Sequence, residues 1–202
     1  MKSIAIKMLF TSTVMSLATL PLLVNADEVT SNITTPSQDV LEARSLVKAF
    51  GSDLKSVLMT TMKTEGPIKA LAVCNTEAGP IAKKHSALSN WTIGRTSTKV
   101  RNSDNAPDQW ESSVLAQFEQ RKAAGEDVTT MEYSAMVKSG DKNVYRYMKP
   151  ISTAGGCLVC HGKNIDNNIT DKIKSLYPND QATGFSLGDI RGAFSLQRRR
   201  SN

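Results

Sequence analysis

The chain has 202 residues, only 5% of them aromatic, and a formal net charge of +6 at pH 7. The basic residues are scattered, apart from a short run at 198–200. A nucleic-acid interface needs clustered basic residues, so the composition gives no support to nucleic-acid binding. A chain of this length suits one domain.

The first 26 residues have the pattern of a secretory signal peptide. Two lysines precede a mostly apolar run from residue 8 to 24, and Val24 and Ala26 occupy the −3 and −1 positions of a cleavage site. Hydroxyl side chains interrupt the run and Pro21 breaks its end, so it falls short of the roughly 20 apolar residues of a spanning helix. We expect cleavage after residue 26, export, and no membrane-spanning segment afterwards. An uncleaved anchor is the alternative.

The predicted elements are helices followed mainly by strands. A Thr-Pro-Ser-Gln capping box at 35–38 opens an amphipathic helix from about 35 to 63, and a second helix follows around 67–78. The later elements are a strand at 91–97, a helix at about 107–124, a hairpin with strands at about 130–138 and 143–149, and a last strand at about 190–197. This order predicts an α+β fold. We expect one domain at 37–197, a flexible segment at 27–36 and a solvated basic tail at 198–202.

The cysteines carry the clearest chemical signal. There are three, Cys74, Cys157 and Cys160, and an odd number in an exported chain requires a use other than pairing. Residues 157–161 read Cys-Leu-Val-Cys-His, in which two thiols can add to the haem vinyl groups while His161 ligates the iron. The motif predicts one covalently attached haem c. A disulfide loop and half of a zinc site are the alternatives, and the chain has no second ligand pair for zinc.

Few residues could be the second axial ligand. Besides His161, the candidates are His85, Cys74, Met59, Met62, Met131, Met136 and Met148. The methionines fall within helix or strand patterns, so we expect them in the core. His85 follows two lysines and is expected at the surface. Cys74 shares a helical face with Leu71 and Ala78, and that position fits a buried core thiol as well as a ligand.

A series of motifs resembles a family of exported monohaem c-type cytochrome-like domains of unknown function. The motifs are AVC at 72–74, IA at 81–82, GRTS at 94–97, RN at 101–102, NAPDQWE at 105–111, YMKPI at 147–151, CLVCHG at 157–162, YPND at 177–180, ATG at 182–184 and GDIRGAF at 188–194. They occur in order and cover nearly everything from about residue 40 to 197. One departure is Ser103, where the family has proline.

The resemblance implies a PAS-like fold, an antiparallel sheet flanked by helices. It also implies that the haem is ligated by His161 and by an upstream cysteine, which by position is Cys74. From spacing alone the role of Cys74 is open, so its assignment as a ligand depends on this resemblance.

Arginines are the natural partners of the two haem propionates, because a guanidinium presents a planar fork of donors to a carboxylate. Four are plausible: Arg95, Arg101, Arg146 and Arg191. We favour Arg95 and Arg101, which lie within the family's motifs. Trp110 and Tyr177 are candidates for packing against the porphyrin, although buried aromatics are ordinarily core residues.

A haem with imidazole and thiolate ligands would have a low reduction potential. Protonation of the thiol, with a reference pKa of roughly 8.5, could release it and open a site for a small gas ligand. We therefore expect redox or small-ligand sensing in a bacterial periplasm, with the signal passing to a separate protein partner. A soluble electron carrier is the alternative. A haem enzyme needs distal acid–base groups and is the least favoured reading.

Overall fold

The computed structural model describes residues 36–199, which belong to one compact unit. The expected signal peptide, residues 27–35 and residues 200–202 lie outside the described part. The elements in chain order are α1 (Gln38–Thr64), α2 (Gly66–Ala87), β1 (Trp91–Thr96), η1 (Ser103–Asn105), α3 (Gln109–Ala123), β2 (Tyr133–Ser139), β3 (Lys142–Ser152), η2 (Gly155–Cys157), α4 (Leu158–His161), α5 (Asn167–Leu176) and β4 (Ile190–Arg199).

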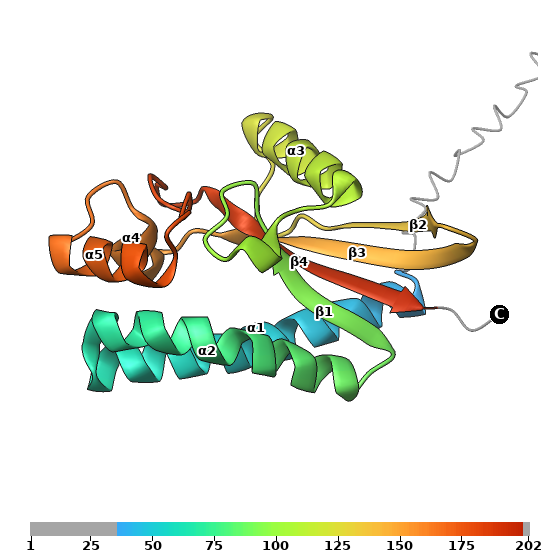
Figure 1. Ribbon diagram of the computed structural model, residues 1–202. Coiled ribbons are helices and arrows are strands. Elements are labelled where there is room, and N and C mark those ends of the chain that lie inside the picture. The colour runs from blue at the N-terminus through green and yellow to red at the C-terminus, as the bar shows by residue number, and fades with distance from the viewer. Residues whose placement is uncertain (1–35, 200–202) are drawn as a thin grey trace, which may run out of the picture. The chain divides into compact units, whose positions relative to one another are not determined.

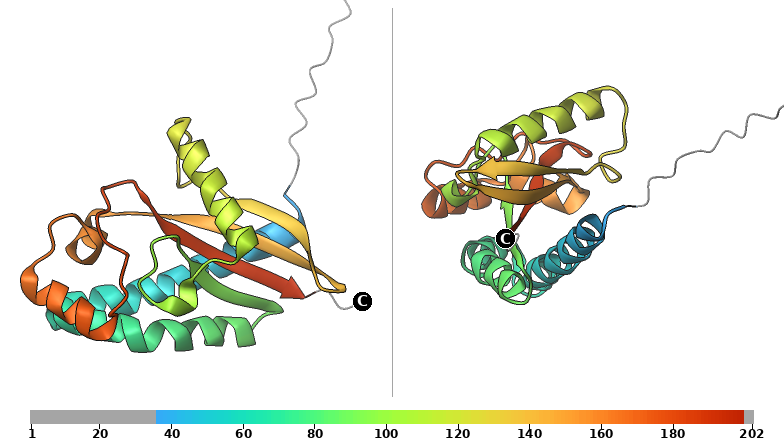
Figure 2. Two further views of the ribbon diagram at one scale, coloured as in Figure 1. Left: turned by 45° about the horizontal axis from the view of Figure 1, so that its top comes forward. Right: turned by 90° about the vertical axis from the view of Figure 1, so that its right-hand side faces the viewer.

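The four strands form one antiparallel sheet in the order β1-β4-β3-β2. The last strand of the chain is therefore inserted between the first and the third. Helices α1 and α2 cover one face of the sheet and α3 covers the other (Figures 1 and 2). The predicted α+β fold, a PAS-like antiparallel sheet flanked by helices, with two N-terminal helices, is confirmed.

Each face of the sheet has its own apolar core. Neighbouring strand residues point to opposite faces, so Tyr147 and Met148 on β3 belong to different cores. The core under α1 includes Phe50, Trp91, Ile93, Tyr147 and Leu196. The core under α3 includes Val114, Phe118, Met131, Met148 and Ala193.

Helix α1 begins later than its sequence pattern predicts. Its N-cap is Ser37, whose hydroxyl accepts a hydrogen bond from the Val40 N–H at 3.3 Å. The predicted capping residue, Thr35, lies outside the described residues, and Pro36 precedes the helix. Serine and threonine can both cap a helix through a side-chain hydroxyl, so the short Thr-Pro-Ser run left two possible start points.

The predicted surface position of His85 is wrong. Helix α2 continues to Ala87, and His85 lies on the side of it that packs against α1, where only 8% of the residue is exposed. Its ring lies edge-on to Phe50, and Nε2 is 3.0 Å from an Asp53 carboxylate oxygen. Tertiary packing of α2 on α1 therefore overrides the polar neighbours of His85 in sequence.

The methionine prediction is partly wrong for the same reason. Met131 and Met148 are fully buried, as expected. Met59 and Met136 are exposed, at 37% and 47%. Apolar character alone does not tell which side of a helix or hairpin meets the core.

The predicted solvated tail begins too early. Strand β4 continues to Arg199, and the Arg198 guanidinium pairs with Asp39 and Glu42 on α1 and lies over the Trp91 ring. Arg198 thus joins the last strand to the first helix. The rest of the expected tail, residues 200–202, lies outside the described part.

Helices α4 and α5 were not predicted, and they extend the fold beyond one end of the sheet (Figure 1). Helix α5 packs against α2 through a small apolar cluster of Leu71, Ile169 and Ile173. This contact brings the C-terminal part of the chain onto α2. In the described part of the chain, no helix is both long and apolar enough for a membrane span.

Candidate functional site

The Cys-x-x-Cys-His motif occupies a single tight turn formed by η2 and α4. Cys157 and Cys160 are free thiols and half-buried. The turn closes with a 2.9 Å hydrogen bond from the Gly162 N–H to the Leu158 carbonyl. A Cβ on residue 162 would come within 2.6 Å of that same carbonyl oxygen, so only glycine lets the chain turn directly after His161.

The His161 ring is held by a backbone carbonyl. Nδ1 lies 2.6 Å from the Ala182 carbonyl oxygen. A carbonyl can only accept, so Nδ1 carries the hydrogen and donates, which leaves the lone pair on Nε2. Backbone bonds from Gly184 and Phe185 to the carbonyls of Gly162 and His161 hold this loop against α4. The arrangement is the usual outer-sphere support of a metal-ligating histidine.

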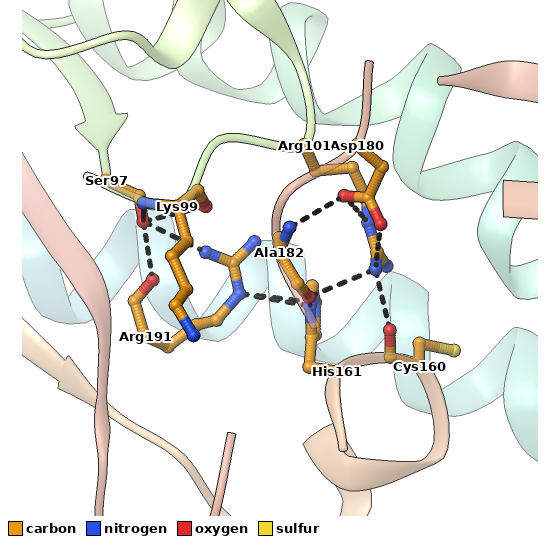
Figure 3. A network of polar contacts seen from close by, with 8 residues as sticks. All are labelled: Ser97, Lys99, Arg101, Cys160, His161, Asp180, Ala182 and Arg191. Carbon is orange, nitrogen blue, oxygen red and sulfur yellow. Dashed lines mark hydrogen bonds and ion pairs between the residues drawn. The ribbon is translucent and has the colours of Figure 1, made fainter. Parts of the chain in front are cut away.

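A buried ion pair lies next to this hydrogen bond (Figure 3). Arg101 Nε and Nη2 donate to the two carboxylate oxygens of Asp180 at 2.9 and 3.1 Å. Nη2 also donates to the carbonyls of Cys160, at 2.6 Å, and of Ala182, at 3.2 Å. Arg101 therefore connects three segments, the loop after β1, the Cys-x-x-Cys-His motif and the loop after α5.

Arg191, at the start of β4, lies against the other side of His161. Its Nε is 3.2 Å from Nδ1 and 3.4 Å from Nε2. An atom almost equidistant from both ring nitrogens lies over the ring and not along the Nε2 lone pair. Burial, followed by Arg101 and Arg95, lowers the pKa of Arg191 to about 10, so it remains charged at neutral pH.

His161 itself is neutral at ordinary pH. Burial, and then the positive charges of Arg191 and Arg101, lower its pKa to about 3. A neutral imidazole with a free Nε2 lone pair is the form that binds a metal.

Cys74 comes to the same place from α2. It is half-buried one turn after Leu71, and Cys160 packs against the apolar cluster to which Leu71 belongs. Burial raises the pKa of the Cys74 thiol, and the charges of Arg95 and Arg101 oppose that rise. The structure thus brings the predicted residues Cys74, Arg95 and Arg101 to the motif.

The described residues do not balance the positive charge of the site. The charges of Arg191, Arg101 and Arg95 all contribute to lowering the pKa of His161. The charges of Arg101 and Arg95 also contribute to lowering the pKa of Arg191. Within residues 36–199, Asp180 is the one carboxylate that forms an ion pair with any of the three. Arg95 is half-buried, and burial lowers its pKa. A half-buried cation favours a nearby anion, and the described carboxylates leave two of these three positive charges without an ion-pair partner.

Two other predicted residues, Arg146 and Trp110, lie away from the site. Arg146 is on the face of the sheet covered by α3, where it pairs with Asp108 and Glu111 at 2.6 and 3.1 Å. Its guanidinium lies 4.3 Å from the centre of the Trp110 ring. Tyr177, in contrast, is buried at the site and interacts electrostatically with Cys74 and Arg95.

Sequence reasoning missed the supporting residues Asp180 and Ala182 and undervalued Arg191. The available signal was their position inside motifs, since Asp180 ends YPND, Ala182 begins ATG and Arg191 lies in GDIRGAF. Asp180 and Arg101 are 79 positions apart in the chain, and no local sequence pattern predicts a contact over such a separation.

Comparisons with known proteins give a family and a fold. Residues 20–198 match the model of the Tll0287-like family. Among solved structures, the crystal structure of the cyanobacterial heme-protein Tll0287 is similar, with a TM-score of 0.62 and 21% identity over 83% of this chain and 99% of that chain. No curated protein matches the chain.

Proposed function

The chain belongs to the Tll0287-like family, and from this premise we propose that it binds one haem. Cys157 and Cys160 would attach the porphyrin covalently, and His161 would ligate the iron. The relative of the same fold is itself described as a heme-protein. Such a group supplies an iron centre that changes oxidation state.

The charge of the site is the observation that carries this proposal. Two propionates would add two negative charges, and the three guanidinium groups exceed the carboxylates paired with them by the same number. Arg95 and Arg191 are the better placed donors, because neither has an ion-pair partner among the described residues. Arg101 remains a candidate through its Nη1.

The described donors also suit iron. The Ala182 carbonyl fixes the Nδ1–H form of His161 and leaves Nε2 available. The two motif thiols are unpaired, as attachment to vinyl groups requires. The residues present therefore fit a c-type haem.

We assign the second axial position to Cys74. Its position beside Arg95 would stabilise a thiolate, while burial favours uptake of a proton at Sγ. These opposing effects suit a ligand that stays bound in the ferric protein and leaves after reduction. On this basis the protein is a sensor of redox state or of a small ligand, and it signals through a separate partner protein.

The test is the absorption spectrum of the full exported chain, ferric and dithionite-reduced, with and without carbon monoxide. The wild type should show a low-spin ferric spectrum with thiolate charge-transfer bands, and Cys74→Ala should lose those bands. Carbon monoxide binding by the reduced wild type supports sensing. A reduced form that stays six-coordinate and ignores carbon monoxide identifies an electron carrier instead.

Two sets of controls make the result specific. Thr76→Ala changes an exposed residue of the same helix and should leave the charge-transfer bands intact. The double variant Cys157→Ser, Cys160→Ser should lose haem staining on a denaturing gel, because no thioether bond can form. Haem that remains on the gel in this variant would contradict covalent attachment at the motif.

We further propose that the chain is exported to the periplasm with cleavage after residue 26. The pattern of residues 1–26 supports this, and those residues lie outside the described part. The intact mass of protein from a periplasmic extract should equal that of a chain beginning at Asp27 plus one haem. A mass that includes residues 1–26 would show that the leader is retained.

A further inference from the structure

We infer that the Arg101–Asp180 ion pair is a positioning unit for His161, which sets the tautomer and orientation of its ring through the Ala182 carbonyl. This rests on the proposed function only in naming haem iron as the metal. This role is separate from the propionate contact expected from sequence, because it uses only Nε and Nη2 of Arg101.

The first step is the placement of the carbonyl. The Asp180 carboxylate accepts both Arg101 donors and also the Ala182 N–H, at 3.0 Å. Arg101 in turn donates to the Ala182 oxygen. The N–H and the carbonyl of residue 182 are therefore both tied to the same ion pair, so the oxygen that faces His161 has little freedom.

The second step concerns the histidine. Arg101 Nη2 donates to the carbonyl of Cys160, the residue directly before His161. The same guanidinium thus anchors both partners of the hydrogen bond between His161 Nδ1 and the Ala182 carbonyl. It holds His161 through the carbonyl of the preceding residue, Cys160, and it holds Ala182 through the carbonyl oxygen itself. Movement of either would stretch a bond to Arg101.

The third step is burial. The side chains of Arg101 and Asp180 are 10% and 7% exposed. Water competes poorly with hydrogen bonds at such a site, and a buried ion pair with several further hydrogen bonds holds its geometry. Arg191 completes the arrangement by covering the ring, so the carbonyl fixes the edge of the imidazole and Arg191 fixes its plane.

The decisive measurement is the tautomer of His161 in the full chain before haem attachment, by nitrogen-15 NMR of the imidazole. The chain has two histidines, so His85→Gln assigns the signals. The wild type should show His161 almost entirely with hydrogen on Nδ1. Asp180→Asn and Arg101→Lys should each give a mixture with a large Nε2–H fraction.

Glu132→Gln is the matched control. It breaks another Arg–carboxylate pair of the same two-bond geometry, with Arg44, away from the motif. It should leave the His161 tautomer unchanged. An equal change in this variant would mean that general loosening of the fold, and not the Arg101–Asp180 pair, controls the ring.

A second readout uses the haem-loaded chain. Loss of outer-sphere support commonly weakens a metal–ligand bond about 10- to 100-fold, so the population with His161 off the iron should rise at least about tenfold in both variants. Electron paramagnetic resonance of the ferric protein measures this population.

The outcomes separate the possible roles of Arg101. If Arg101→Lys changes the electron paramagnetic resonance spectrum and Asp180→Asn does not, Arg101 acts through a propionate and not through the ion pair. That result would overturn the inference. Unchanged tautomer populations in both variants would overturn it as well. If the wild type carries no haem, the proposed function fails, while the NMR result still tests the positioning of His161.

Discussion

Gly192 shows at the residue scale how closely the site's supporting strands approach. It lies directly after Arg191 on β4, with φ at +150°. A Cβ there would collide with the Thr96 carbonyl oxygen and lie 3.0 Å from the Ser97 Cβ. Glycine is therefore required where β4 passes the end of β1, and this close approach places Arg191 over His161.

Gly192→Ala should lower the free energy of unfolding by about 3 kcal/mol, the combined scale of backbone strain and overpacking. Urea unfolding followed by circular dichroism measures the change. Gly94→Ala is the control in the same strand pair, because its nearest neighbour would be 4.0 Å away. It should change stability by no more than about 1 kcal/mol. Equal losses in both variants would refute the steric explanation for Gly192.

At the element scale, a polar network joins α1 to the segment before β2 and to β3. Glu132 accepts hydrogen bonds from Arg44 Nε at 2.8 Å and from the Tyr147 hydroxyl at 2.7 Å. The Arg44 bond, opposed by burial and aided by Tyr147, holds the pKa of Glu132 below its ordinary value of 4.5. A carboxyl with a depressed pKa stabilises the fold above its unfolded pKa and loses that contribution as pH falls through the folded pKa.

Glu132→Gln should lower the free energy of unfolding at pH 7 by about 2 kcal/mol, the scale of hydrogen bonds to a charged group. Below pH 4.5 the difference from wild type should shrink, because the unfolded chain takes up a proton first and the native carboxyl does so only at its lower pKa. Denaturant unfolding at pH 7 and pH 3 measures both values. Glu126, which pairs with Arg121, has a more exposed side chain than Glu132, so Glu126→Gln should cost under about 1 kcal/mol. A difference that persists undiminished at pH 3 would contradict the ionic explanation.

On the scale of the whole molecule, the site joins parts of the chain that pack at one end of the sheet. Cys74 comes from the N-terminal helical hairpin, and Arg101 comes from the loop after β1. The motif follows β3, and the other supporting residues precede or begin β4. A group bound to Cys74 and His161 would therefore cross-link α2 to α4 and close a long loop. Such a cross-link stabilises a fold chiefly by restricting the unfolded chain.

The full chain with attached haem should be more stable to urea than the haem-free chain, and Cys74→Ala should remove part of that gain. The part lost is at most about 5 kcal/mol, the loop-closure entropy for a loop of this order of length. Circular dichroism of the four proteins, wild type and variant with and without haem, completes the comparison. An equal haem-dependent gain in both would show that Cys74 does not close the loop.

Sequence alone determined the features that depend on short spacing. The C-x-x-C-H motif is readable because five consecutive residues suffice for its chemistry, and most helices and strands follow from periodicity over single elements. The errors at Ser37, His85 and Arg198 occurred where a local pattern is compatible with two environments and tertiary packing selects one.

Tertiary structure alone decided how the site is supported. The insertion of β4 between β1 and β3 brings Arg191 to His161, and the packing of α5 on α2 brings the loop with Asp180 and Ala182 to Arg101. These contacts join residues far apart in the chain, and their energy comes from burial and from long-range hydrogen bonds. No periodicity or spacing in the sequence encodes them, so candidate ligands could be predicted while the contacts that support His161 could not.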